Sequence, residues 1–174
     1  VEVRPYNEVT TGDFRDFDGL IIGPGPGDPT DGQDPKIQHL QKITKAALED
    51  PTLAVTGICL GHQIVCKMLG LELKTLPEPT QGRQIEQIWF GKQIKMGHYN
   101  SFYAQKTANT EKIERLRGKI TLSRDENGWI NGLKGSRLIS FQGHPESVLS
   151  IDGHQLFIDA VCSTLEQDAM EDVA

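Results

Sequence analysis

One cysteine of this chain lies where a nucleophile could be placed. Cys59 stands between two glycines in the segment 57–61, directly after the apolar run 53–55 and directly before a helix-like segment, 60–69. This order predicts a sharp strand-to-helix turn that carries the thiol. The glycines would let the backbone turn tightly, and N–H groups at the start of the helix would favour the thiolate. A small buried cysteine that ends a core strand is the alternative interpretation.

A base for such a nucleophile is offered by His144. It follows the apolar run 138–141 and is separated from Glu146 by the rigid Pro145. At this spacing the Glu146 carboxylate can hold one ring nitrogen and leave the other to face Cys59. The alternative is a surface loop in which the glutamate is only solvated.

Donors for an oxyanion are also available. The backbone amide of Leu60 follows the nucleophile, and the loop Gly25-Pro26-Gly27 follows an apolar segment, 17–23. The carboxyl ends of parallel strands meet at one edge of a sheet, where α/β proteins place their sites. A plain turn is the alternative for this loop, whose glycine spacing does not fit a nucleotide-binding loop.

The elements that must position these residues follow an α/β pattern. Strands are predicted at 1–6, 17–23, 53–58, 71–76, 84–90, 92–96, 101–104, 120–124, 129–133 and 138–141, and helices at 35–49, 60–69 and 152–165. We therefore expect an open, mostly parallel sheet with helices on both faces and a small antiparallel β element. The tail from Glu166 is expected to fray. A first strand and helix are expected ahead of Val1, which would make this single domain, 1–174, a fragment of a longer polypeptide.

Composition excludes several classes of function. The chain has 174 residues and a net charge of −6, with its 18 Lys and Arg scattered, so we expect neither a nucleic-acid nor a membrane surface. Three cysteines without paired spacing fit neither a disulfide scaffold nor a zinc site and indicate the cytoplasm. Cys66 and Cys162 are predicted to be core residues, and no metal site is expected.

The other histidines are weaker candidates. His62 is one turn into the helix and is expected to pack or cap, and His98 has no carboxylate nearby in the sequence. His39 and His154 are predicted on solvated helix surfaces.

Three segments together resemble the class I, triad-type glutamine amidotransferases. They are Gly25–Pro29, Gly57–Gln63 and Gly143–Ser147, in the matching order across nearly the whole chain. The resemblance implies that Cys59 attacks the side-chain amide of L-glutamine, that a glutamyl thioester forms and ammonia leaves, and that water then releases glutamate while His144 relays protons. It also implies that Gln63 and the loop 25–27 hold glutamine.

The middle of the chain resembles the chorismate-aminating branch of this family. The segments in which this resemblance lies are 79–82, 90–91 and 97–102. The resemblance implies that Ser101 and Phe102 contact glutamine. Asn100 stands where the branch usually has His, and Gly143 where Phe is common. Together with the segment 146–153, this pattern is most similar to fused aminodeoxyisochorismate synthases of phenazine pathways, with anthranilate synthase as the related possibility. It implies a chorismate-binding synthase partner, fused or separate, that would hold any Mg²⁺, and no cofactor in this domain.

Other functions stay open at this point. The ammonia could serve p-aminobenzoate, GMP or carbamoyl phosphate synthesis, and a γ-glutamyl peptidase could use the same thiol. A catalytically silent regulatory module is a further alternative.

Overall fold

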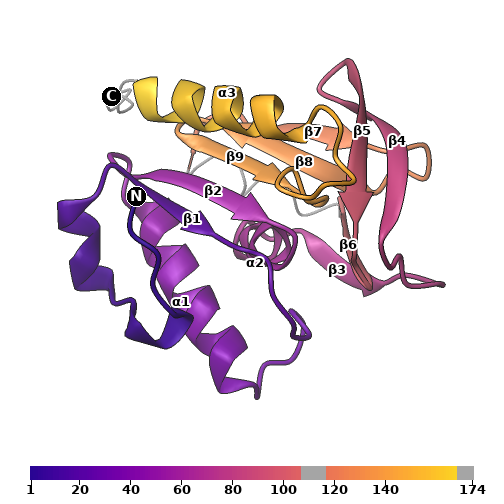
Figure 1. Cartoon of the computed structure of the whole chain (residues 1–174). Coiled ribbons are helices and arrows are strands. Elements are labelled where there is room, and N and C mark those ends of the chain that lie inside the picture. The colour runs from indigo at the N-terminus through magenta and orange to yellow at the C-terminus, as the bar shows by residue number, and fades with distance from the viewer. Residues whose placement is uncertain (107–116, 168–174) are drawn as a thin grey trace.

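A mixed β-sheet forms the centre of the molecule (Figure 1). The computed structural model describes residues 1–106 and 117–167. The sheet consists of β1 (Gly19–Ile22), β2 (Ala54–Ile58), β3 (Glu72–Thr75), β6 (Phe102–Gln105), β7 (Thr121–Arg124), β8 (Ile130–Gly135) and β9 (Leu138–Phe141). Its order is β1-β2-β9-β8-β6-β3, with β7 beside β8. The strands β1, β2 and β9 are parallel, and the pairs beyond β9 are antiparallel.

Helices cover both faces of this sheet, as predicted (Figure 1). The helices α1 (Pro35–Glu49) and α2 (Leu60–Met68) lie on one face and α3 (Gly153–Glu166) on the other. The start of α1 is fixed locally, because the Asp34 side chain accepts a hydrogen bond from the Lys36 amide at 2.8 Å and Pro35 occupies the first helical position. The predicted small antiparallel element is the two-stranded β4 (Arg83–Trp89) and β5 (Lys92–His98), which we call the ribbon.

The core is built where α2 meets the parallel strands. Val55 on β2 and Val65 on α2 are completely buried and belong to one apolar cluster. A second cluster fills the space between α3 and the ribbon, where Trp89 stacks on Phe141 with ring centroids 4.8 Å apart. The strand β9 thus packs against helices on both faces, and it leads directly to the segment that carries His144.

The predicted strand at 1–6 is wrong. Residues 1–5 form no strand and Val1 and Val3 are exposed, while short 3-10 helices span Tyr6–Glu8 and Thr11–Asp16. Residues 1–5 alternate between apolar and polar side chains, but in the described chain they pair with no strand, and β1 pairs only with β2 and forms the edge of the sheet. The same position at the sheet edge leaves Ile21 exposed in a strand predicted to be buried.

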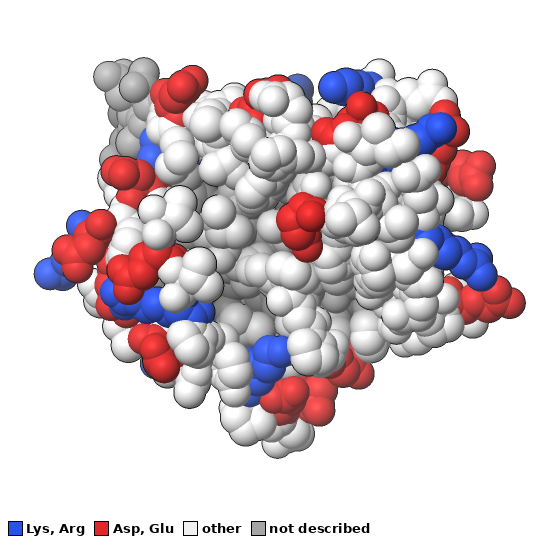
Figure 2. Space-filling view, in the orientation of Figure 1, with Lys and Arg blue, Asp and Glu red and all other residues white. Residues whose placement is uncertain are grey.

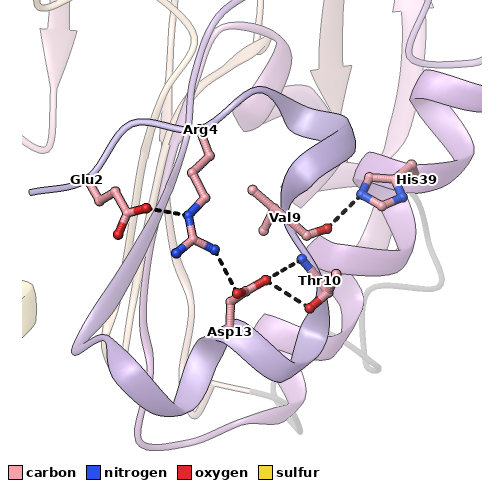
Figure 3. A network of polar contacts seen from close by, with 6 residues as sticks. All are labelled: Glu2, Arg4, Val9, Thr10, Asp13 and His39. Carbon is pink, nitrogen blue, oxygen red and sulfur yellow. Dashed lines mark hydrogen bonds and ion pairs between the residues drawn. The ribbon is translucent and has the colours of Figure 1, made fainter.

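Polar contacts hold the N-terminal segment instead (Figure 3). Arg4 donates to the Asp13 carboxylate at 2.7 Å, and Asp13 also accepts from the amide and hydroxyl of Thr10 at 2.6 and 2.8 Å. Hydrogen bonds from the Thr10 backbone and side chain, and then from Arg4, lower the pKa of Asp13 to about 2. His39, predicted to be solvated, contacts the carbonyl oxygen of Val9 at 3.0 Å from its Nε2 and is half-buried.

The two remaining core cysteines have different outcomes. Cys66 is completely buried, as predicted, but Cys162 is exposed, so its core assignment is wrong. The buried side of α3 carries Leu156 and Ala160, and a residue two positions beyond Ala160 lies on the opposite side of the helix. The predicted fraying concerns mainly residues 168–174, which lie outside the described residues.

On one face of the molecule, the charged side chains are scattered and do not gather in a single patch (Figure 2). Figure 2 shows acidic and basic side chains interspersed around the periphery of one face, whose hollowed middle carries few charges. Within the ranges 1–106 and 117–167, no helix combines the length and the apolar character that crossing a membrane requires.

Candidate active site

The turn at Cys59 has the predicted strand-to-helix geometry. The strand β2 ends at Ile58 and α2 begins at Leu60, with Cys59 as the residue between them. Cys59 has φ 51° and ψ −104°, and its amide donates to the carbonyl of Phe141 on β9 at 2.9 Å. A non-glycine residue held in such a region costs about 1–3 kcal/mol, which the surrounding packing must offset.

Two glycines make this turn sterically feasible. A Cβ added to Gly61 would lie 1.9 Å from the carbonyl oxygen of Ile22, and one added to Gly57 would lie 2.9 Å from the backbone of Gly61. These are contacts with backbone atoms, which cannot be relieved by a side-chain rotation. The glycines therefore let α2 begin directly against β1 with Cys59 at its N-terminus.

His144 and Glu146 form a direct pair. The Nδ1 of His144 lies 2.8 Å from Oε1 of Glu146, with 13% of the histidine side chain and 44% of the glutamate side chain exposed. Because an ionised carboxylate only accepts hydrogen bonds, Nδ1 carries a proton. The other ring nitrogen, Nε2, is buried without a hydrogen-bond partner among the described residues and is free to exchange a proton with a reacting group.

The electrostatics of the pair favour the imidazolium. Burial acts to lower the pKa of His144, but the interactions with the Cys59 side chain and with Glu146 outweigh it and raise that pKa to about 9. Burial likewise acts to raise the pKa of Glu146, and the hydrogen bond from His144 reverses this, so that the pKa lies below its usual value. At neutral pH this arrangement holds a proton on His144.

A cavity of about 530 Å³ brings most of the predicted site residues together. Its lining includes these predicted residues: Gly25, Pro26, Gly27, Cys59, Gln63, Ser101, Phe102 and His144. Glu146 does not line the cavity and touches it only through His144. Leu60 does not line it either, but its side chain reaches the glycine loop, and its amide, at the first position of α2, has no acceptor within the helix.

Four lining residues were not predicted as site residues. They are Pro24, Gln81, Tyr99 and Asn100. The Tyr99 ring packs edge-on against the His144 ring, with centroids 5.0 Å apart. Tyr99 and Asn100 directly precede the predicted Ser101, and that adjacency was the available clue. Pro24 directly precedes the predicted Gly25 and offered the same clue, whereas Gln81 lines the cavity from a separate loop that the sequence does not place there.

The amide of Gln63 is fixed by two contacts. Its Nε2 donates to the carbonyl of Phe102 at 3.1 Å and to Oε1 of Gln142 at 3.2 Å, while Asn100 donates to the same Phe102 carbonyl at 2.9 Å. Because both N–H groups of Gln63 are used, its side chain offers a ligand only an acceptor oxygen.

Two further histidines lie near the site but are buried and neutral. Burial lowers the pKa of His62 and of His98 to about 4. His62 packs as predicted, with Nδ1 2.8 Å from the Ser140 hydroxyl. The Nε2 and Nδ1 of His98 contact side-chain amides of Gln87 and Asn100. In the described part of the chain, no three His, Cys, Asp or Glu side chains gather as a metal site would require.

Comparison with known proteins places this geometry in a family. The family model described as "Glutamine amidotransferase class-I" matches residues 1–163. The phenazine-specific anthranilate synthase of Pseudomonas chlororaphis is 37% identical over 164 residues, which is 92% of this chain and 25% of that protein. The anthranilate synthase component 2 of Archaeoglobus fulgidus is 30% identical over 154 residues, which is 87% of this chain and 79% of that protein. The chain thus spans about a quarter of the length of the Pseudomonas relative.

The fold is also found among solved structures. A glutamine amidotransferase of Thermotoga maritima, solved at 1.70 Å resolution, superimposes with a TM-score of 0.55 at 16% identity, covering 87% of this chain and 65% of that one. At this identity the likeness concerns the fold alone.

Proposed function

The chain belongs to the class I glutamine amidotransferase family, and on that premise we propose that Cys59, His144 and Glu146 hydrolyse L-glutamine to glutamate and ammonia. The observation that carries the proposal is one cavity lined by the strained Cys59 and by His144, whose Nδ1 is held by Glu146 at 2.8 Å.

In the first half of the reaction, a thioester forms. The Cys59 thiolate bonds to the side-chain carbonyl carbon of glutamine, and the carbonyl oxygen takes the negative charge. Backbone N–H groups of Leu60 and of the loop 25–27 would stabilise that oxyanion. The carbon–nitrogen bond then breaks, and the amide nitrogen leaves as ammonia with a proton from His144.

In the second half, water completes the cycle. Neutral His144 takes a proton from water as its oxygen bonds to the thioester carbon, and the carbon–sulfur bond breaks to return the thiolate and release glutamate. A pKa of about 9 for His144 suits this cycle, because the free site starts with the proton that the leaving nitrogen needs. No cofactor is required by these steps.

The proposal extends to a partner. Named relatives are anthranilate synthases, and the chain corresponds to a quarter of the Pseudomonas protein, which leaves most of that polypeptide for another activity. We therefore propose that the ammonia is consumed by a chorismate-binding synthase, either fused to this domain or separate from it, with any Mg²⁺ in that partner. The free cysteines Cys59, Cys66 and Cys162 agree with a cytoplasmic location.

Glutamate release tests the first proposal. Cys59→Ser is expected to abolish it, whereas Cys162→Ser, which changes an exposed cysteine on α3, should leave it unchanged. Equal activity of the Cys59 variant and the wild type would contradict the triad. Release of amino acids from γ-glutamyl peptides without ammonia formation from glutamine would instead indicate a peptidase.

The identity of the molecule that accepts the ammonia tests the second proposal, that of the synthase partner. The natural polypeptide that carries this sequence, with its synthase partner, should aminate chorismate from glutamine or from added ammonia. Amination of a nucleotide or of carbonate instead of chorismate would overturn the assignment of the partner.

A further inference from the structure

One hydroxyl group makes hydrogen bonds both to the ribbon and to the loop that carries His144. The Oγ of Ser150 accepts a hydrogen bond from the Gly97 amide at 2.8 Å and donates one to the His144 carbonyl at 2.5 Å. Ser150 is 7% exposed, so these bonds are protected from water. One side chain therefore connects the end of β5 to the backbone of the histidine.

A second bond joins the same two segments. The amide of His144 donates to the carbonyl of Gly97 at 2.9 Å, and the two residues form a single antiparallel β-bridge between this loop and β5. A Cβ at Gly97 would lie 3.0 Å from the Cβ of Leu149, so the segments are in close contact. Both polar backbone groups of His144 are thus bonded, and Ser150 bridges them to β5.

The position of Ser150 follows from two consecutive turns. The Ser147 amide donates to the His144 carbonyl at 3.0 Å, and the Ser150 amide donates to the Ser147 carbonyl at 2.9 Å. These turns fold the chain back, so that a residue six positions after His144 reaches its carbonyl. Because β9 ends at Phe141, the sheet itself does not hold this loop.

We propose that Ser150 is a positioning residue, which holds the His144 backbone so that the imidazole stays between Cys59 and Glu146. This inference rests on the proposed role of His144 as the proton carrier. Ser150 does not line the cavity and so would not bind glutamine. A shift of about 1 Å in a catalytic group can reduce a rate about 10²-fold.

Replacement of Ser150 gives the direct test, made in the natural polypeptide. Ser150→Ala should lower kcat for glutamate release about 10- to 100-fold and change KM for glutamine little. The pKa of His144, followed by NMR of its ring, should fall, because the displaced imidazole loses its contacts with Cys59 and Glu146. Ser150→Thr keeps the hydroxyl and should restore both readouts.

A matched control is available at Ser123. Its Oγ also accepts from a backbone amide, that of Phe90 at 3.1 Å, and donates to a backbone carbonyl, that of Ile88 at 3.2 Å. It is 5% exposed and lies at the other end of the ribbon. Ser123→Ala should therefore lower the thermal midpoint while leaving kcat and the pKa of His144 unchanged.

The outcomes separate the two proposals. A wild type that releases no glutamate overturns the proposed function. If the wild type is active, two results would overturn the positioning role alone. One is a Ser150→Ala variant with wild-type kcat and a wild-type pKa of His144. The other is a Ser123→Ala variant whose kcat falls as much as that of Ser150→Ala. If Ser150→Ala unfolds at the assay temperature, Ser150→Cys keeps the volume, weakens both bonds and should show the same loss in smaller degree.

Discussion

Replacing Glu146 with Gln removes the negative charge beside His144 and changes the size of the side chain little. The pKa of His144 is about 9, against an ordinary value of 6.5. That difference corresponds to at most about 3 kcal/mol in favour of the protonated ring. The glutamate side chain is 44% exposed and Cys59 supplies the other favourable contact, so the share of Glu146 should be about 1 kcal/mol.

Two effects on activity follow from this change. The pKa of His144 should fall below 9 but remain above 6.5, because the interaction with Cys59 persists. The glutamine amide can also donate to Nδ1, which places the ring proton on Nε2, where it prevents the base step. We expect kcat to fall about 10²-fold, the lower end for general acid–base catalysis, because the partner is partly solvated. KM should change little, since Glu146 does not line the cavity.

The assay combines the pH dependence of kcat with NMR titration of His144. Glu126→Gln, which changes an exposed carboxylate in the turn between β7 and β8, serves as the control and should match the wild type in both readouts. If Glu146→Gln left kcat and the pKa of His144 at wild-type values, the assignment of Glu146 as the orienting group would be refuted.

Three further perturbations test the framework around the site. Gly61→Ala should lower the free energy of unfolding, measured in urea, by more than about 4 kcal/mol, since its Cβ would lie 1.9 Å from the Ile22 carbonyl oxygen. A loss below about 1 kcal/mol would contradict this packing. Arg117→Met should lower the free energy of unfolding by about 3 kcal/mol, because the buried guanidinium donates to carbonyls around the end of α1, including those of Leu48 at 3.0 Å and Leu53 at 2.8 Å. Retention of the wild-type denaturation midpoint would show that water replaces the guanidinium as the donor. The contribution of His144 to the free energy of unfolding should be complete below pH 6.5 and lost as pH rises through about 9, because folding raises the pKa of its ring. His144→Gln should lack this loss of stability, and identical pH dependence of the two proteins would contradict the prediction.

The local features of the site could be read from the sequence because they depend on neighbouring residues. The turn at Cys59 follows from an apolar run, two glycines and a helical segment, and the structure shows it. The spacing of His144 and Glu146 likewise predicted their contact, observed at 2.8 Å. The loop 25–27 meets Cys59 because strands β1 and β2 are parallel neighbours.

Features that depend on tertiary neighbours could not be read in this way. Residues 1–6 have strand-like alternation, but a strand needs a partner, and these residues pair with no strand of the described chain. Cys162 lies in an apolar stretch, yet the rotation of α3 turns it outward. The packing of the Tyr99 ring against His144 joins residues 45 positions apart, and the adjacency of Tyr99 to the predicted Ser101 does not reveal that contact.

The central claim is that Cys59 forms a covalent bond to the glutamyl group. Mass spectrometry of the protein, quenched in acid during glutamine turnover, tests it most directly. We predict a mass increase of one γ-glutamyl group on the peptide that contains Cys59, absent from Cys59→Ser. Glutamine hydrolysis without this adduct, or with the adduct on Cys66 or Cys162, would contradict the account.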